Sequence, residues 1–229
     1  MRIFLPSIEL YRFESEFVGT NMYLIFSGGE ALAVDPHFDE EADKILKENA
    51  VRKVTVFLTH EHPDHTQGLP WLKNSFDTEI VCQEQCAASI AVEKNNRPYL
   101  ITFVLSQKDE KNGTRLLEKF KKTVCPYAFQ SDITFDKELD YDWHGQHFHF
   151  RHTPGHSKGS CCITVNSEAV FTGDSLIFDT PVITRFPGGS KEDFETKTKP
   201  YLNTFADETI VLAGHGKTFK MKEARDVGF

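Results

Sequence analysis

Ligand-type side chains follow four apolar, strand-like runs of this 229-residue sequence, and this repeated placement constrains the fold more than any other feature. The run at 54–58 (VTVFL) leads directly into THEHPDH, which places four such side chains within six positions: His60, His62, Asp64 and His65. A strand end is where a rigid sheet can aim several side chains at one point. His60 and His62 are two residues apart, so an extended loop would point them the same way. Asp64 and His65 would then serve a neighbouring position, and the crowding predicts two adjacent metals.

Three further ligand-type residues occupy equivalent positions downstream. Each follows an apolar, strand-like stretch and abuts a glycine: His156 in HTPGHSKGS, Asp174 in VFTGDSL and His215 in VLAGHGKTF. Isolated histidines are usually surface residues or hydrogen-bonded core residues. Seven ligand-type side chains occur at four strand ends, and a metal centre explains this pattern better than coincidence does.

The hydrophobic pattern predicts an α/β fold, in which sheets are covered by outer helices. In the first half, strands are expected at 21–26, 31–34, 54–58 and 79–82, and helices at 39–49, 68–76 and 83–96. In the second half, strands are expected at 147–152, 161–165, 169–171 and 209–212, with a helix near 191–205. The length suits one sizeable core, so residues 1–229 are predicted to form a single domain.

Residues 95–130 do not fit the alternating pattern and are predicted to be a helical insertion. They combine an apolar stretch, a polar turn around Asn112-Gly113 and a basic amphipathic helix. Two interpretations stay open, a surface elaboration of the scaffold and a lid over the active site.

Charge and composition exclude several classes of partner. The net charge is −8 and no long Lys/Arg run occurs, so a nucleic-acid partner is not expected. No apolar stretch approaches the length that spans a bilayer, and the N-terminus lacks a leader pattern. We therefore expect a cytoplasmic protein without a membrane partner. The five cysteines have neither disulfide-framework nor zinc-pair spacing and are expected to be mostly buried small hydrophobic residues.

Five motifs together resemble the metallo-β-lactamase fold superfamily, with hydrolases of the glyoxalase II type as the most similar branch. They are AVDP at 33–36, HxHxDH at 60–65, TPGHSKGS at 153–160, FTGDSL at 171–176 and AGHG at 213–216. The resemblance runs from about residue 21 to residue 217, apart from the insertion. It implies a four-layer αβ/βα sandwich of two mixed sheets with outer helices, and a dinuclear metal site where loops from both halves meet.

The resemblance also implies a role for each ligand-type residue. His60, His62 and His156 would hold the first metal, and Asp64, His65 and His215 the second. Asp174 would bridge the two metals, and Asp35 would fix the tautomer of a ligating histidine. Imidazole and carboxylate ligands suit two zinc ions, with iron and manganese as alternatives. Because these seven positions fill the centre, the remaining histidines are not expected to bind metal: His37, His144, His147, His149 and His152.

The implied reaction is hydrolysis of a small-molecule thioester or activated ester. A hydroxide shared by two metals would attack an acyl carbonyl, while Asp64 orients the hydroxide and accepts its proton. Zinc β-lactamases typically have cysteine or serine where Asp174 stands, so a β-lactam is not the expected substrate. Lys158 and Arg185 are candidates for contacts with an anionic substrate, although exposed cations are usually only solvated.

Departures from the glyoxalase II pattern leave alternatives open. In VITRFPGGS (182–190), Arg185 stands where related enzymes commonly have an acidic residue, so glutathione thioesters are not favoured. A mononuclear iron persulfide dioxygenase shares most of these ligand motifs, and a lactonase or β-lactamase-like hydrolase is a further alternative. An inactive scaffold would be expected to have lost ligands, whereas all seven positions are filled here.

Overall fold

The computed structural model describes residues 1–97 and 99–229, and its first sheet has seven strands in sequence order. β1 to β4 pair antiparallel, and β4 to β7 pair parallel. The strands are β1 (Arg2–Phe4), β2 (Glu9–Glu14), β3 (Asn21–Ser27), β4 (Glu30–Val34), β5 (Lys53–Phe57), β6 (Asp77–Gln83) and β7 (Ile133–Phe135). The hairpin between β3 and β4 turns at Gly28 and Gly29, which have φ values of 58° and 82° that favour glycine.

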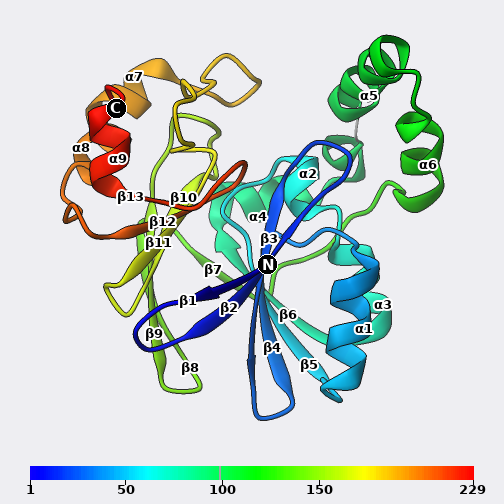
Figure 1. Cartoon of the computed structure of the whole chain (residues 1–229), viewed down its shortest axis with the longest axis horizontal. Helices are drawn as coiled ribbons and strands as arrows, with labels where there is room; N and C mark the ends of the chain where they lie inside the picture. Colours follow the sequence, from blue (N-terminus) through cyan, green and yellow to red (C-terminus); the bar gives the residue numbers. More distant parts are fainter. Residues whose placement is uncertain (98) are drawn as a thin grey trace.

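The second sheet has six strands in the order β13-β12-β11-β10-β9-β8. Only β11 and β12 pair parallel. The strands are β8 (Glu138–Trp143), β9 (Gln146–His152), β10 (Cys161–Val165), β11 (Ala169–Gly173), β12 (Ile210–Ala213) and β13 (Phe219–Lys220). The two sheets face each other, with the termini on different sheets (Figure 1).

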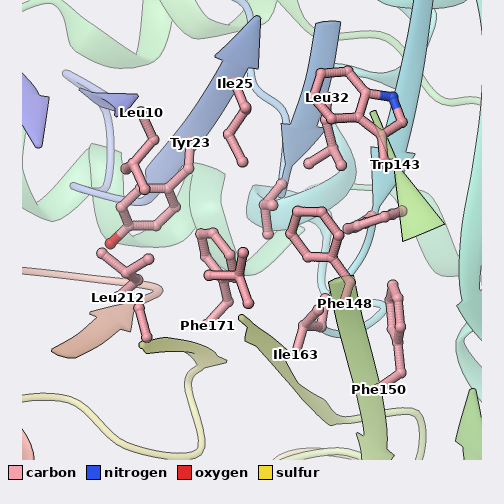
Figure 2. Close-up of a cluster of buried hydrophobic side chains, with 14 of the residues drawn as sticks. Leu10, Tyr23, Ile25, Leu32, Trp143, Phe148, Phe150, Ile163, Phe171 and Leu212 are labelled. Carbon is pink, nitrogen blue, oxygen red and sulfur yellow. The ribbon is translucent and has the colours of Figure 1, made fainter. Parts of the chain in front are cut away.

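Apolar side chains from both sheets form the central core. Figure 2 shows Tyr23, Ile25 and Leu32 of the first sheet facing Phe148, Phe150, Ile163 and Phe171 of the second. The Phe57 ring makes edge contacts with Phe148 and Phe150 at centroid distances of 5.1 and 4.7 Å. Packing of this kind excludes water from between the sheets and fixes the strand ends relative to each other.

Helices cover the outer face of each sheet. On the first sheet these are α1 (Glu40–Glu48), α3 (Leu69–Ser75) and α4 (Glu84–Ile90), and on the second α8 (Lys199–Leu202) and α9 (Met221–Asp226). α1 begins where the Asp39 carboxylate accepts a hydrogen bond from the Ala42 amide at 2.9 Å. The short helices α2 (Pro63–Thr66) and α7 (Lys191–Asp193), the 3-10 turn Glu93–Asn96 and the π-helical turn Phe194–Thr198 lie in connections. The layers confirm the predicted αβ/βα sandwich.

The 95–130 segment contains two helices, α5 (Tyr99–Asn112) and α6 (Leu116–Thr123), which stand beside the sandwich (Figure 1). The chain turns between them at Gly113, where φ is 67°. Ile101, Leu105 and Phe120 form a small core with Phe17 of the β2–β3 loop. Lys108 Nζ also donates a hydrogen bond of 2.9 Å to the carbonyl of Phe17. The insertion is therefore fastened to one loop of the first sheet.

Several elements differ from the prediction. The expected helix at 83–96 ends at Ile90, and a 3-10 turn follows it. The sequence patterns did not predict β1, β2, β7, β8, β13 or α9. Cys82, Cys86, Cys161 and Cys162 are buried free thiols, as expected, and Cys125 is exposed. In the described parts of the chain, no helix is long and apolar enough to cross a bilayer.

Candidate metal centre

The seven predicted ligands converge at one edge of the sandwich, where five strands end. The loops after β5, β9, β11 and β12 carry them, and Asp35 follows β4. Two backbone hydrogen bonds join the sheets at this edge, from the Asn21 amide to Gly214 at 2.7 Å and from the Cys161 amide to Thr59 at 2.8 Å. The β5 loop of one sheet therefore lies against loops of the other.

The ligand atoms form two groups that match the two predicted sets. One ligand atom from each of His60, His62 and His156 lies within 4.8 Å of the others, and the same holds for Asp64, His65 and His215. In the first group, His62 Nδ1 and His156 Nε2 are 2.9 Å apart. In the second, Asp64 Oδ2 is 3.5 Å from His65 Nε2 and 3.3 Å from His215 Nε2.

Asp174 lies between the two groups. Its Oδ1 is 3.4 Å from His65 Nε2, while its Oδ2 is 3.6 Å from both His156 Nε2 and His215 Nε2. Gly214 allows this approach, because a Cβ added there would lie 2.4 Å from Asp174 Oδ1. One carboxylate thus reaches a histidine of the first group and both histidines of the second, as a bridging ligand would.

Hydrogen bonds around the centre select the histidine tautomers that a metal requires. Thr59 Oγ1 donates to Asp35 Oδ2 at 2.6 Å, so it is free to accept from His60 Nδ1 at 3.1 Å. His65 Nδ1 donates to the same Asp35 oxygen at 2.9 Å, and His156 Nδ1 donates to the Ile183 carbonyl at 2.9 Å. In the neutral form of each of these histidines, Nε2 is then left with the lone pair that a metal needs.

A bound metal would provide a partner for buried polar atoms that otherwise have none. Among the described residues, His60 Nε2, His65 Nε2 and Asp174 Oδ1 are buried side-chain atoms without a hydrogen-bond partner. Leaving such atoms unpaired away from water is costly. The donor set of imidazole and carboxylate fits zinc, iron or manganese, so these residues suit a divalent metal.

Protonation tendencies differ between the two groups. Burial lowers the pKa of His60 and His62, and that of His156 to about 4, which favours neutral imidazole. Burial also acts to lower the pKa of His65 and His215, but nearby carboxylates, Asp64 among them, outweigh it and raise both. Burial alone would raise the pKa of Asp174, yet His65 and its neighbours hold it at about 2. The second group therefore combines protonated histidines with ionised carboxylates when no metal is bound.

Asp35 belongs to a third close group, with His60 and His65. Its carboxylate already accepts from the Thr59 amide at 2.8 Å, from the Thr59 hydroxyl and from His65 Nδ1. These contacts match the supporting role expected for it. The backbone at Asp35 has a φ of 52°, a left-handed conformation that is uncommon for a residue other than glycine.

Three polar residues that the sequence reading did not single out support the predicted ligands. Thr59 joins Asp35 to His60, and Thr20 Oγ1 donates to Asp64 Oδ2 at 3.0 Å. Glu61 accepts from Ser157 Oγ at 2.9 Å and from the Gly159 amide at 3.3 Å, which joins the β5 loop to the β9 loop. Thr59 and Glu61 directly flank His60, and this adjacency was the sequence feature that could have indicated their supporting roles.

A cleft of about 1060 Å³ opens over the centre, and His62, Asp64, Asp174 and His215 line it. Residues of the 94–104 segment and of the 176–188 segment also line it. Lys158 lies in its wall, whereas Arg185 is exposed without lining the cleft. The histidines not expected to bind metal lie outside the two groups: His144, His147 and His149 contact carboxylates of Glu30, Asp142 and Asp140.

Two known proteins are similar in sequence to this chain over most of its length. "Probable metallo-hydrolase YqgX" of Bacillus subtilis is 25% identical over 201 residues, which cover 87% of this chain and 86% of that protein. "Atrochrysone carboxyl ACP thioesterase" of Aspergillus chevalieri is 25% identical over 165 residues, covering 69% of this chain and 41% of that protein.

Solved structures have the same fold. The BLEG-1 B3 metallo-beta-lactamase superposes with a TM-score of 0.71 at 22% identity, covering 95% of this chain and 96% of that chain. The di-iron-bound form of TTHA1623 superposes with a TM-score of 0.68 at 18% identity, covering 95% and 98%. The family model described as "Metallo-beta-lactamase superfamily" matches residues 16–215. The chain therefore belongs to the metallo-beta-lactamase superfamily.

Proposed function

We propose that this protein is a dinuclear, divalent-metal-dependent hydrolase of thioesters or activated esters. The observation that carries the proposal is the position of Asp174, whose carboxylate lies within 3.6 Å of ligand nitrogens in both histidine groups. A carboxylate so placed suits two metals rather than one. Zinc is the proposed metal, with iron and manganese as alternatives.

In this proposal His60, His62 and His156 hold one metal, Asp64, His65 and His215 hold the other, and Asp174 contacts both. When bound, such a metal pair supplies a hydroxide nucleophile near neutral pH and polarises the carbonyl under attack. Asp64 has a proposed second role, because its carboxylate lines the cleft and can orient the attacking oxygen. Thr20 fixes that carboxylate by donating to Oδ2.

The cleft favours an anionic substrate. Outside the ligand residues, the charged side chains that line it are Glu61, Lys94, Arg97, Lys158 and Lys217. Glu61 accepts hydrogen bonds from the β9 loop, and Arg97 and Lys217 pair with Glu93 and Glu223 at 3.3 and 3.1 Å. Lys94 and Lys158 are the remaining cations of the lining. Lys158 is the proposed contact for a carboxylate or phosphate of the substrate, whereas Arg185 has no such support. The cytoplasmic location and the absence of nucleic-acid and membrane partners stay predictions.

The proposed bridging carboxylate favours a thioester over a β-lactam, because it should hold the metals close together. Metals held in this way would have less need to bind the nitrogen of an opened lactam. A relative named as an acyl-carrier thioesterase is consistent with this choice. The alternative is an iron oxidoreductase, such as a persulfide dioxygenase. The di-iron-bound form of TTHA1623, a protein of the same fold, keeps iron in consideration.

Two measurements together test the proposal. Elemental analysis of the purified protein should give two divalent metals per chain, and one iron per chain would favour oxygen chemistry. A substrate panel should show turnover of thioesters or activated esters. Efficient turnover of the β-lactam nitrocefin with inert thioesters and esters would contradict the proposed substrate class.

A further inference from the structure

The cleft is larger and more apolar than hydrolysis of a small acyl group requires. Its volume of about 1060 Å³ is at the upper end for small-molecule sites. The predicted metal ligands are only four of its lining residues, and most of the others come from the 94–104 and 177–188 segments and from α4. An acetyl group bound at the centre would leave most of this space to water.

One wall is an apolar strip that begins at the metal centre. The ring of Phe186 lies 5.9 Å from the ring of His62, so the strip starts at a predicted ligand. Ile183, whose carbonyl accepts from His156, is 37% exposed and continues the strip outward. The same hydrogen bond that orients His156 thus fixes the backbone of this wall.

Helix α5 also lines the cleft. Ile101 and Val104 are three residues apart and therefore lie on one helical face, and both line the cleft. Val104 is 40% exposed, although its neighbour Leu105 is fully buried against the Phe17 loop. Val104 and Ile183 are therefore exposed apolar side chains in a concave site, and such side chains mark a surface that binds an apolar ligand.

We propose that the substrate is a thioester of a long, linear acyl chain, which lies between α5 and the 176–188 segment with its carbonyl at the metal centre. This inference rests on the proposed function. In the reaction, water adds to the carbonyl, the carbon–sulfur bond breaks, and a fatty acid and a free thiol leave. Val104, Ile183 and Phe186 contact the chain and set its preferred length.

The test is a chain-length series of neutral N-acetylcysteamine thioesters, from acetyl to decanoyl, with thiol release as the readout. We expect kcat/KM to rise about two- to fourfold for each added methylene, because each buried methylene adds apolar contact. Equal kcat/KM at every length, with turnover present, would overturn the inference and leave the proposed function standing. Absence of turnover at every length would instead overturn the proposed function, and this inference with it.

A charged substitution in the wall gives a second, independent measurement. Val104→Asp should lower the ratio of decanoyl to acetyl kcat/KM about tenfold, because the chain would meet a carboxylate. Val92→Asp is the matched control, since Val92 is 39% exposed but lies outside the cleft, and its ratio should stay at the wild-type value. Thermal melting of both variants establishes that they fold. An unchanged ratio in folded Val104→Asp would show that another occupant, such as a protein segment, covers this wall.

Discussion

Asp174 is the residue on which the proposed two-metal arrangement depends most, because its oxygens approach both ligand groups. Asp174→Ala should lose at least one metal and lower kcat/KM by about a hundredfold or more, since loss of even a supporting partner costs ten- to a hundredfold. Metal content and turnover are the measurements. Asp226→Ala, at an exposed position on α9, is the control and should keep both. Full metal content and turnover in Asp174→Ala would refute the bridging role.

Thr59 acts through the histidine that follows it. Its hydroxyl accepts from His60 Nδ1 only because it donates to Asp35, and Thr59→Val removes both contacts while keeping the shape. Metal affinity should fall about ten- to a hundredfold, measured by competition with a chelator. Thr164→Val on β10 is a matched control away from the centre, and its affinity should not change. Equal affinities in the two variants would remove Thr59 from the metal site.

The opposite pKa shifts of the histidines predict two steps of metal release. His65 and His215 have raised pKa values and hold protons that a metal must displace, so on acidification the affinity of their group begins to fall at a higher pH than that of the first group. The pKa of His156 is about 4, so the first group keeps neutral ligands to lower pH. Metal retained after dialysis between about pH 7 and pH 4 should therefore fall in two steps. Simultaneous loss of both metals would contradict this order.

Among the structural elements, the α5–α6 insertion can be removed most simply. Its ends are close, because Asn96 Nδ2 donates to the Tyr127 carbonyl at 2.8 Å, and a short linker can replace residues 99–124. The deletion should keep both metals, since no predicted ligand lies there, but should lower kcat/KM for the true substrate by about tenfold as one cleft wall is lost. A surface elaboration without a role in access would instead leave the kinetics unchanged.

The elements that the sequence predicted are those with strong local signals. β5 is buried on both faces and reads as a continuous apolar run, and α1 has an N-cap and an apolar face. β1, β2 and β8 were not predicted, because they are partly exposed and their apolar residues alternate with charged residues, such as Asp140 and Asp142 in β8. The proposed ligands could be singled out because each follows a strand end, and the structure brings their ligand atoms together. Thr20 was not singled out, because it is 44 residues away in sequence from Asp64, to which its hydroxyl donates a hydrogen bond.

At the scale of the whole molecule, the metal centre joins the two sheets. Loops of the first sheet carry His60, His62, Asp64 and His65, and loops of the second carry the other three. The family resemblance implied that loops from both halves meet, but the distances between their side chains are fixed only once the sheets pack through the Phe57 and Phe148 core. Each proposed metal takes ligands from both sheets, so metal binding and sheet packing should be coupled.

Metal removal should therefore lower the thermal stability of the whole chain. Binding at a hundred times the dissociation constant contributes about 3 kcal/mol to the folded state. For a chain of this size that corresponds to a fall in Tm of about 5–10 °C on chelation. The measurement is thermal unfolding with and without a chelator, followed by re-addition of zinc, which should restore Tm. Asp174→Ala is the informative comparison, because a variant that has already lost metal should respond less to the chelator. A Tm that the chelator leaves unchanged in the metal-loaded wild type would show that the two sheets hold together without the metals.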